Sequence, residues 1–412
     1  MAETLRNLRA TATLATALAS VAFASGVSAQ TVGEDYLEFG GQVDLRYDSN
    51  VINGNAQRAE ARGFSRDDQV VTPSLTAAIN KTFGRNAVRA SALIGYDFHL
   101  QNPRLDSERI SVDLLGLISL SVCELRPGIN FQRRQAERGD RSLVIDPGIA
   151  IDNVQTIQEY KLDVACGRSI GLRPIGGVSF RSGDNSSDLR QLADFNTFTY
   201  YGGLGYQQPS IGTLDLYASK ASTEYENRMI GDEFDGFDVF RAGAAYSRDI
   251  GARWNARIEG FYIDTNAVTA VEENYNGLGW NIGLNGTFPP RLSLGVQFGK
   301  DVQPVLNNDA LYMKQTTYGV NADYAVNERW NIGAAYSLRD RNYVYSAALP
   351  PSTEGNLTED QFNTATVSAT YTTASPLSFT AYGGYENRSA NNPIFDYDGF
   401  YAGLTVKYLF RR

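Results

Sequence analysis

Residues 399–410 read "GFYAGLTVKYLF" and lie almost at the end of the chain. Side chains alternate between the two faces of an extended strand. One face of this segment is then wholly apolar, with Phe400, Ala402, Leu404, Val406, Tyr408 and Phe410. The other face is mixed, with Tyr401, Gly403, Thr405, Lys407 and Leu409. Such a strand needs either a protein core or lipid against its apolar face.

The start of the chain predicts export. Arg6 and Arg9 precede the uncharged run "TATLATALASVAFASGV", and the small residues Val27 and Ala29 fit a signal-peptidase site. We therefore expect a cleaved signal peptide at residues 1–29 and a short periplasmic segment at residues 30–36. No other stretch has the roughly 20 consecutive apolar residues of a membrane helix, which excludes a helical membrane protein.

The same alternation recurs along the rest of the chain. It is found at residues 86–98, 253–266, 277–288 and 328–338, with an aromatic residue near one or both ends of each apolar face. Many other residues on these faces are Ala or Gly, which would leave voids in a soluble sandwich. Lipid needs no such fit. It needs a closed sheet with an apolar outer band between aromatic girdles, so the apolar face of residues 399–410 is predicted to meet lipid.

Short turns such as "DIGAR" at 249 alternate with long polar loops such as "DVQPVLNNDALY" at 301. Outer-membrane barrels place short turns in the periplasm and long loops outside. Counting both kinds predicts an all-β, antiparallel, up-and-down barrel of about 18 strands, with 16 as the alternative. The barrel takes up residues 37–412, in the outer membrane of a Gram-negative cell, in contact with lipid and lipopolysaccharide.

The segments "GGQVDLRYDSNV" at 40 and "TPSLTAAINKTFGRNAVRASALIGYDF" at 72 resemble the β-barrel porin 2 family, the VpsM-like outer-membrane barrels. The matching positions are Tyr47, Asp48, Asn50, Pro73 and the turn at residues 84–86. This resemblance implies a barrel that secretes an exopolysaccharide beside a periplasmic polysaccharide-export protein. The last strand also resembles the signal read by the barrel assembly machinery, with Tyr408 and Phe410 at its aromatic end. It departs from that pattern because Arg411 and Arg412 follow.

The chain has 2 cysteines, Cys123 and Cys166. Both fall in periplasmic turns, and the strands that enter these turns are expected to be separated by one strand, roughly 10 Å of sheet. This distance lies slightly beyond disulfide reach, so turn flexibility has to supply the remainder. The oxidising periplasm favours a bridge, and two separate thiols are the alternative.

The polar strand faces give the candidate lumen residues. The basic candidates are Arg89, Arg133, Arg241, Arg257, Arg339 and Lys407, and the aromatic candidates are Tyr201, Tyr217, Phe261, Tyr382 and Tyr401. Basic residues in a wet lumen would favour anions, or they would pair with lumen carboxylates such as Asp97, Asp113 and Glu259. Flat aromatic surfaces would suit pyranose rings, although ordinary girdle or rim packing is the favoured explanation for each residue taken singly.

Three functions remain open at this point. They are a conduit for exopolysaccharide, a general or anion-preferring diffusion porin, and a structural or surface protein with a plugged lumen. Catalysis is not expected: the single histidine, His99, lies near Asp97 as an ordinary solvated pair does, and no nucleophile can be placed beside it. Neither a cofactor nor a metal site is expected. The formal net charge of -9 makes nucleic acid an improbable ligand.

Overall fold

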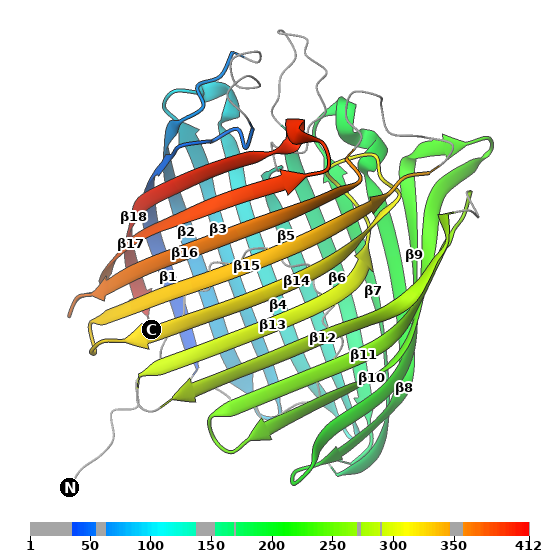
Figure 1. Ribbon diagram of the computed structural model, residues 1–412. Coiled ribbons are helices and arrows are strands. Elements are labelled where there is room, and N and C mark those ends of the chain that lie inside the picture. Colours follow the sequence, from blue (N-terminus) through cyan, green and yellow to red (C-terminus); the bar gives the residue numbers. More distant parts are fainter. Residues whose placement is uncertain are drawn as a thin grey trace, which may run out of the picture.

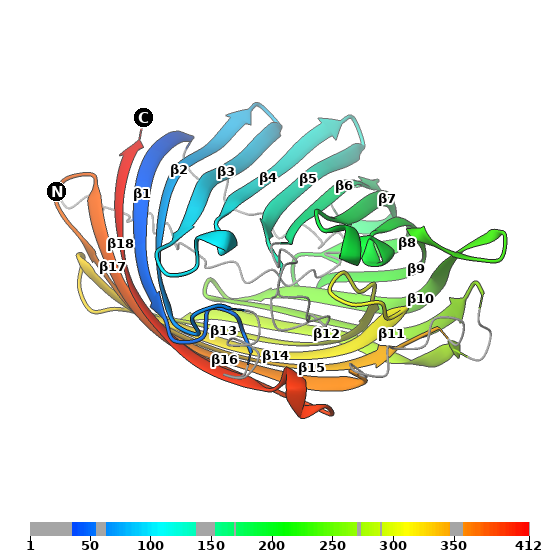
Figure 2. The same cartoon turned by 90° about the horizontal axis from the view of Figure 1, so that it is seen from above.

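A computed structural model describes residues 35–54, 63–136, 153–168, 170–269, 273–288, 291–346 and 357–411. These residues form one antiparallel sheet of 18 strands, in which β1 pairs with both β2 and β18 and so closes a barrel (Figures 1 and 2). The predicted fold class and strand number are confirmed. The predicted signal peptide lies outside the described residues and stays a prediction.

The strands are β1 (Tyr36–Asp48), β2 (Asp68–Phe83), β3 (Asn86–His99), β4 (Ser107–Leu120), β5 (Cys123–Gln135), β6 (Val154–Cys166), β7 (Gly171–Asn185), β8 (Phe195–Gln208), β9 (Gly212–Ile230), β10 (Glu233–Ile250), β11 (Trp254–Ala267), β12 (Tyr275–Phe288), β13 (Leu292–Gln303), β14 (Tyr312–Ala325), β15 (Trp330–Val344), β16 (Glu359–Thr372), β17 (Leu377–Ala390) and β18 (Tyr397–Arg411). Single 3-10 turns are η1 (Pro103–Leu105), η3 (Asp188–Ala193) and η5 (Pro393–Phe395).

The strands have between 12 residues (β13) and 19 residues (β9). A tilted strand needs only about 9–11 residues to cross the hydrocarbon. In Figure 1 the β9–β10 hairpin, drawn in green at the upper right, projects outward from the rest of the wall. No helix among the described residues is long and apolar enough to span a membrane.

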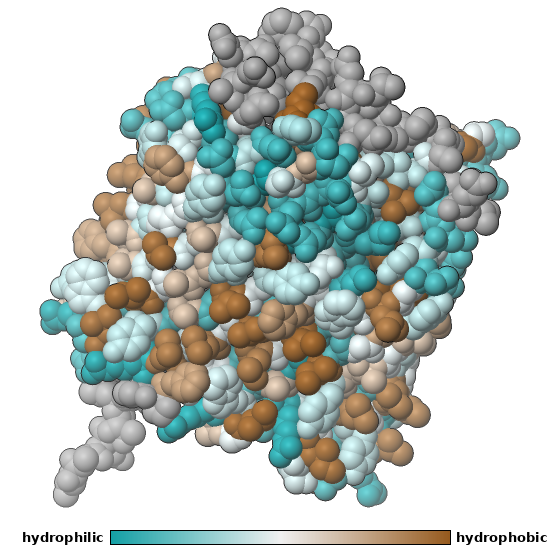
Figure 3. Space-filling model, viewed as in Figure 1, coloured by the Kyte–Doolittle hydropathy of each residue, from teal (hydrophilic) through white to brown (hydrophobic). Residues whose placement is uncertain are grey.

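The outer face of the barrel carries the apolar side chains. In β18 and β1, Phe400 is 55% exposed, Leu404 40%, Val43 43% and Leu45 47%. Aromatic pairs flank this band. The ring centres of Tyr47 and Phe400 are 5.9 Å apart near the loop end, and those of Trp330 and Tyr371 are 5.0 Å apart near the turn end. The face seen in Figure 3 has apolar residues over the lower strands and hydrophilic residues higher up. The chain is an outer-membrane β-barrel, and its polar faces line the interior.

Cys123 and Cys166 form a disulfide at the turn end. They are direct register partners on β5 and β6, and their Cα atoms are 4.0 Å apart. The expected intervening strand was wrong. Cys123 begins the strand that leaves its turn, and this strand is the immediate neighbour of the strand that Cys166 ends.

Candidate functional site: a narrowed barrel lumen

One hairpin tip folds into the barrel. β12 pairs with β13 only from Trp280 and Lys300 downward, while β13 and β14 continue pairing to Gln303 and Met313. The tip of the β13–β14 hairpin therefore has no neighbour on the β12 side and can lean inward. In Figure 2 this tip, drawn in yellow, lies inside the ring of strands, near the green turns of η3. We call residues 304–311 the inner segment.

Hydrogen bonds fasten the inner segment to a distant part of the wall. Gln155 Nε2 on β6 donates to the Leu306 carbonyl at 3.2 Å and to Asn307 Oδ1 at 2.7 Å. Asn185 Nδ2 on β7 donates to the same Leu306 carbonyl at 3.3 Å, and Arg190 of η3 donates to the Asn307 carbonyl. Five strands, β8 to β12, lie between β7 and β13 in the sheet. The inner segment thus bridges separate sectors of the wall.

Apolar contacts also pack the inner segment against the wall between β7 and β13. Leu306 and Leu311 belong to a buried cluster with inward-facing side chains of β8 to β11, including Tyr225 and Phe237. The Tyr225 hydroxyl donates to the Leu311 carbonyl. A water-filled lumen would not bury these side chains by itself, so the inner segment is what excludes water from this part of the wall.

Two of the expected lumen aromatics are covered. Tyr217 is 7% exposed and Phe261 is 6% exposed, and both belong to this buried cluster. Both lie on the inner face as expected, with Tyr217 opposite Gly203 and Phe261 opposite Gly243 in register. They are not surfaces on which a sugar could stack, because the packing removes them from the lumen.

The other three expected aromatics face inward and lie flat along the wall. A Cβ on Gly177 would come within 2.5 Å of the Tyr201 ring, and one on Gly384 within 2.4 Å of the Tyr401 ring. The glycine on the neighbouring strand therefore makes room for the ring, as in aromatic rescue of glycine in sheets. Hydroxyl groups are also engaged: Tyr201 donates to Asp163 at 3.0 Å, and Tyr382 to Asp44 at 2.8 Å.

The register places five of the six expected basic residues on the inner face. Arg241 is 2.9 Å from Asp301, and Arg257 is 3.8 Å from Glu259. The Arg339 guanidinium lies 4.4 Å from the centre of the Phe362 ring. The inner-face pairings of the remaining two are Arg89 with Asn80, and Lys407 with Ser378 and Gln42.

Arg133 was wrongly assigned to the lumen. It pairs in register with Ile110 and Thr156 and alternates with Gln132, so it shares the outer face with Ile129 and Phe131. Its guanidinium binds Glu108 at 2.6 Å and donates to Thr156 at 2.8 Å. Arg133 lies in the polar run "QRRQ", which does not show an apolar face. It is two residues after Phe131, however, and residues two apart in a strand share a face.

The lumen carboxylates are also engaged. Asp97 accepts from Thr72 at 2.6 Å and is 2.8 Å from Arg109. Asp113 accepts from Asn130 at 2.5 Å, and Glu259 accepts from the Tyr217 hydroxyl at 2.7 Å. Pairing inside the wall, rather than an open row of cations, is the arrangement that these residues show.

A second set of contacts holds the inner segment from the other side. Val305 and Ala310 pack with Tyr343, Leu357 and Phe395, which belong to the loop ends of β15 to β18. Beneath them Asp360 is fully buried between two buried arginines, Arg341 at 2.7 Å and Arg388 at 2.9 Å. Such a charge group stays buried only because each member is paired.

The β7–β8 connection supports the anchor. Asn185 donates from its backbone N–H and from Nδ2 to Asp194 Oδ1, both at 2.8 Å. Burial raises the pKa of Asp194 to about 6, although the hydrogen bonds from Asn185 oppose this shift. For this role, the only signal in the sequence is a polar loop.

His99 is buried and lies beside Asp106 rather than in a solvated pair with Asp97: its backbone N–H donates to Asp106 Oδ1 at 2.7 Å, and its Nδ1 is 3.5 Å from the same oxygen. No group of three or more His, Cys, Asp or Glu side chains within the described ranges could hold a metal ion.

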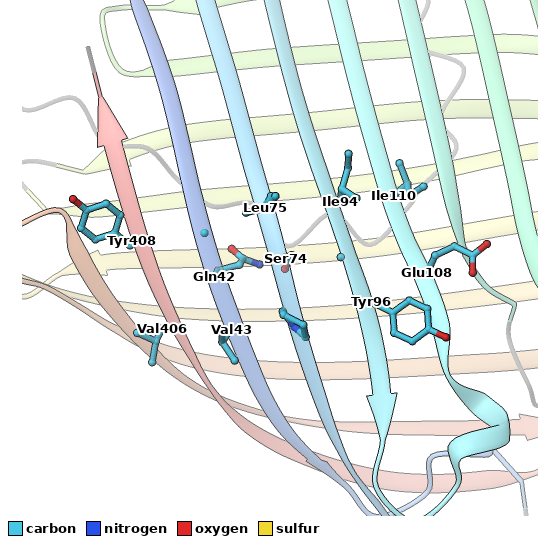
Figure 4. A pocket seen from close by; sticks show the side chains of 13 residues that line it. Gln42, Val43, Ser74, Leu75, Ile94, Tyr96, Glu108, Ile110, Val406 and Tyr408 are labelled. Carbon is cyan, nitrogen blue, oxygen red and sulfur yellow. The ribbon is translucent and has the colours of Figure 1, made fainter.

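A groove of about 760 Å³ lies on the opposite, lipid-facing side of the wall. Outward side chains of β18 and β1 to β4 line it, among them Val406, Leu75, Ile94 and Tyr96, with Glu108 at one end (Figure 4). Because acyl chains cover this face of a barrel, the groove is no part of the passage through the lumen.

Comparisons with known proteins give structural similarities only. No family profile matches the chain, and no curated protein matches it. The solved structure of Pseudomonas aeruginosa OccK2 (OpdF) in complex with glucuronate is similar at 13% identity and a TM-score of 0.47, covering 92% of this chain and 98% of that one. Pseudomonas aeruginosa OccK5 (OpdH) is similar at 12% identity and a TM-score of 0.45, with 92% and 98% covered. Pseudomonas aeruginosa OpdK with vanillate is similar at 13% identity and a TM-score of 0.43, with 91% and 99% covered.

Proposed function

We propose that this barrel is a diffusion channel for small polar solutes, narrowed at its outer mouth by the inner segment. The observation that carries the proposal is the bridge from β13–β14 to Gln155 and Asn185. A barrel of 18 strands can enclose an aqueous channel, and a segment laid across its mouth limits the size of what enters. Diffusion then needs no energy source and no chemistry from the protein.

The exopolysaccharide conduit receives less support. A polymer of pyranose rings would have to pass the inner segment one ring after another, without the stacking surfaces of Tyr217 and Phe261. The rings of Tyr201, Tyr382 and Tyr401 lie against glycines of the neighbouring strands, so they lie along the wall. A periplasmic polysaccharide-export partner therefore remains an implication of the family resemblance alone.

Charge selectivity is proposed to be weak. Arg109, Arg241 and Arg257 each have a carboxylate partner on the wall, so their fields largely cancel at the distance of a passing ion. Arg89, Arg339 and Lys407 also face inward and have no carboxylate opposite them in register, so the proposed preference is a weak one for anions. Reversal potentials across a planar bilayer with a salt gradient measure the preference directly.

Vesicle swelling tests the size limit. Purified barrel in liposomes should admit monosaccharides readily and exclude linear oligosaccharides. A variant in which Gly-Ser-Gly replaces residues 304–311 should admit the oligosaccharides and conduct more current per channel. Equal swelling rates for short and long sugars in the unaltered barrel would show that the inner segment is no filter.

A gene deletion separates the two functions in cells. Loss of a diffusion channel should lower the permeability to small solutes and leave the surface polysaccharide in place. Complementation with the variant that lacks residues 304–311 should restore permeability with a larger size limit. A deletion strain that loses its polysaccharide and keeps its permeability would restore the conduit hypothesis.

A further inference from the structure

Two tyrosines form a reciprocal pair on the inner wall, near the line where β18 meets β1 and closes the barrel (Figure 2). Tyr382 of β17 is opposite Gly403 of β18 in register, and Tyr401 of β18 is opposite Gly384 of β17. A Cβ on Gly403 would come within 2.5 Å of the Tyr382 ring, and one on Gly384 within 2.4 Å of the Tyr401 ring. Each ring therefore lies over the glycine of the neighbouring strand. We call Tyr382 and Tyr401 the tyrosine platform.

The platform has one covered face and one face toward the lumen. An inward ring that lies along the wall covers the sheet with one face, so its other face is turned to the barrel interior. Both rings are half-buried, whereas the inward rings of Tyr217 and Phe261 are buried beneath the inner segment. The ring centres of Tyr382 and Tyr401 are 6.2 Å apart, and their planes are inclined by 58°. Two rings at this spacing offer a surface to a single sugar ring and not a track for a polymer.

Polar groups of β1 and β18 stand beside the platform. The Tyr382 hydroxyl donates to one carboxylate oxygen of Asp44 at 2.8 Å, and Thr405 donates to the other at 2.6 Å, which fixes the position of the ring. On the same face of β1, Arg46 Nη2 is 3.8 Å from Asp48, and Arg46 Nε makes no hydrogen bond with a described residue. These groups can therefore donate and accept hydrogen bonds at the edge of the platform.

The platform lies on the way from the inner segment to the turn end. Arg388 of β17 binds the buried Asp360, beneath the apolar contacts that hold the inner segment on this side. Gly384 and Tyr382 follow on the same face of β17, in the direction of the turn end. A solute that passes the inner segment along this wall therefore meets the platform.

We propose that the tyrosine platform binds a pyranose ring, so that monosaccharides are a preferred class of solute for this channel. The proposal rests on the diffusion function proposed above. The C–H groups on the face of a pyranose carry partial positive charge, which suits the negative face of an aromatic ring. The sugar hydroxyls point outward from the ring, where Arg46 donates and Asp48 accepts. A planar aromatic solute would use the ring faces alone and would leave these polar groups without a partner.

Ion current through barrels in a planar bilayer provides the test. D-Glucose in the bathing solution should reduce the current in a saturable way, because a bound sugar obstructs the passage of ions. Sorbitol carries hydroxyl groups on the same carbon chain but has no ring face, so it should reduce the current only in proportion to its concentration. In Y382L/Y401L, the half-saturation concentration of glucose should rise about fivefold to tenfold, because both stacking surfaces are lost.

Matched variants assign the block to the ring faces. Y382F/Y401F keeps both rings and removes the hydroxyl groups, so it should retain most of the affinity for glucose. The control Y385L/F400L removes two aromatic side chains that are register partners on the outer face of the same two strands, where Tyr385 is 48% exposed and Phe400 55%. This control should leave the half-saturation concentration unchanged. Heat-modifiable migration on gels confirms that each variant is folded.

Several outcomes would overturn the proposal. Ordinary ion conductance without a saturable block by glucose would remove the sugar site and leave the diffusion channel standing, whereas a barrel without conductance would remove both. An equal block by sorbitol, or an equal loss of block in Y385L/F400L, would show that the platform does not recognise a ring face. A block by benzoate at lower concentrations than glucose, abolished in Y382L/Y401L, would assign the platform to planar aromatic solutes instead.

Discussion

Replacing Gln155 by leucine tests whether the inner segment narrows the channel. Gln155 Nε2 makes hydrogen bonds to the Leu306 carbonyl, to Asn307 Oδ1 and to Asn185 Oδ1, at 3.2, 2.7 and 3.2 Å. Leucine has a similar volume and cannot make any of them. The first two of these bonds reach the inner segment, whereas the third joins β6 to β7. At about 1 kcal/mol per net hydrogen bond, the anchored state should therefore lose about 2 kcal/mol. That is a rise of about thirtyfold in the released population of the segment.

Single-channel recording in planar bilayers measures this release. Q155L should show a larger mean conductance or added open-channel noise, and the backbone amides of residues 304–311 should exchange hydrogen faster. Gln158 supplies the matched control, because it lies on the outer face of the same strand and contacts Tyr160. Q158L should behave as the unaltered barrel. If Q155L and Q158L conduct alike and exchange alike, the inner segment is not held by this anchor.

Three further predictions concern stability. Replacing Cys123 and Cys166 by serine should lower the free energy of unfolding by about 4 kcal/mol in the chain-entropy model for a separation of 43 residues; unchanged urea midpoints in oxidised and doubly substituted barrels would contradict this. D360N should destabilise the loop end by about 3 kcal/mol or more, because two buried guanidinium groups lose the carboxylate between them, and a thermal midpoint equal to that of the unaltered barrel would disprove it. Asp194 has a pKa raised to about 6 from 3.8, so its protonated form stabilises the fold most at about pH 4 and below, and this contribution is lost as pH rises through about 6. Exchange protection of residues 186–194, corrected for intrinsic rates, should fall over that range and should not do so in D194N.

Much of the fold could be predicted because alternation is a local property. Every second residue of a strand faces lipid, so the lipid face can be identified within each strand separately. In β18, the alternate residues from Phe400 to Phe410 face outward, as the sequence indicated. The parity that placed Arg241 and Tyr201 inward needed no knowledge of distant contacts. The misplacement of Arg133 was an error in that same counting, since Phe131 two residues earlier fixes the face.

The distance between the two cysteines was harder to predict because it depends on which strands are neighbours. Cys123 and Cys166 both lie at turns, and the sequence does not show that one begins a strand and the other ends the strand beside it. A shift of one strand changes the separation from roughly 10 Å to direct contact. Only the register of β5 and β6 decided it.

The sequence by itself determined the outer-membrane barrel, its lipid face and the inward parity of most candidate residues. The tertiary structure alone decided that residues 304–311, read as one more long outer loop, fold inward and cover Tyr217 and Phe261. A signal existed in the apolar Val305, Leu306 and Leu311 within that loop, but their partners are far away in the chain. Gln155 and Leu306 are 151 residues apart, and no local pattern encodes which distant strand a loop will reach. Closure of the barrel brings these sectors within bonding distance, so the width of the passage is a property of the assembled wall.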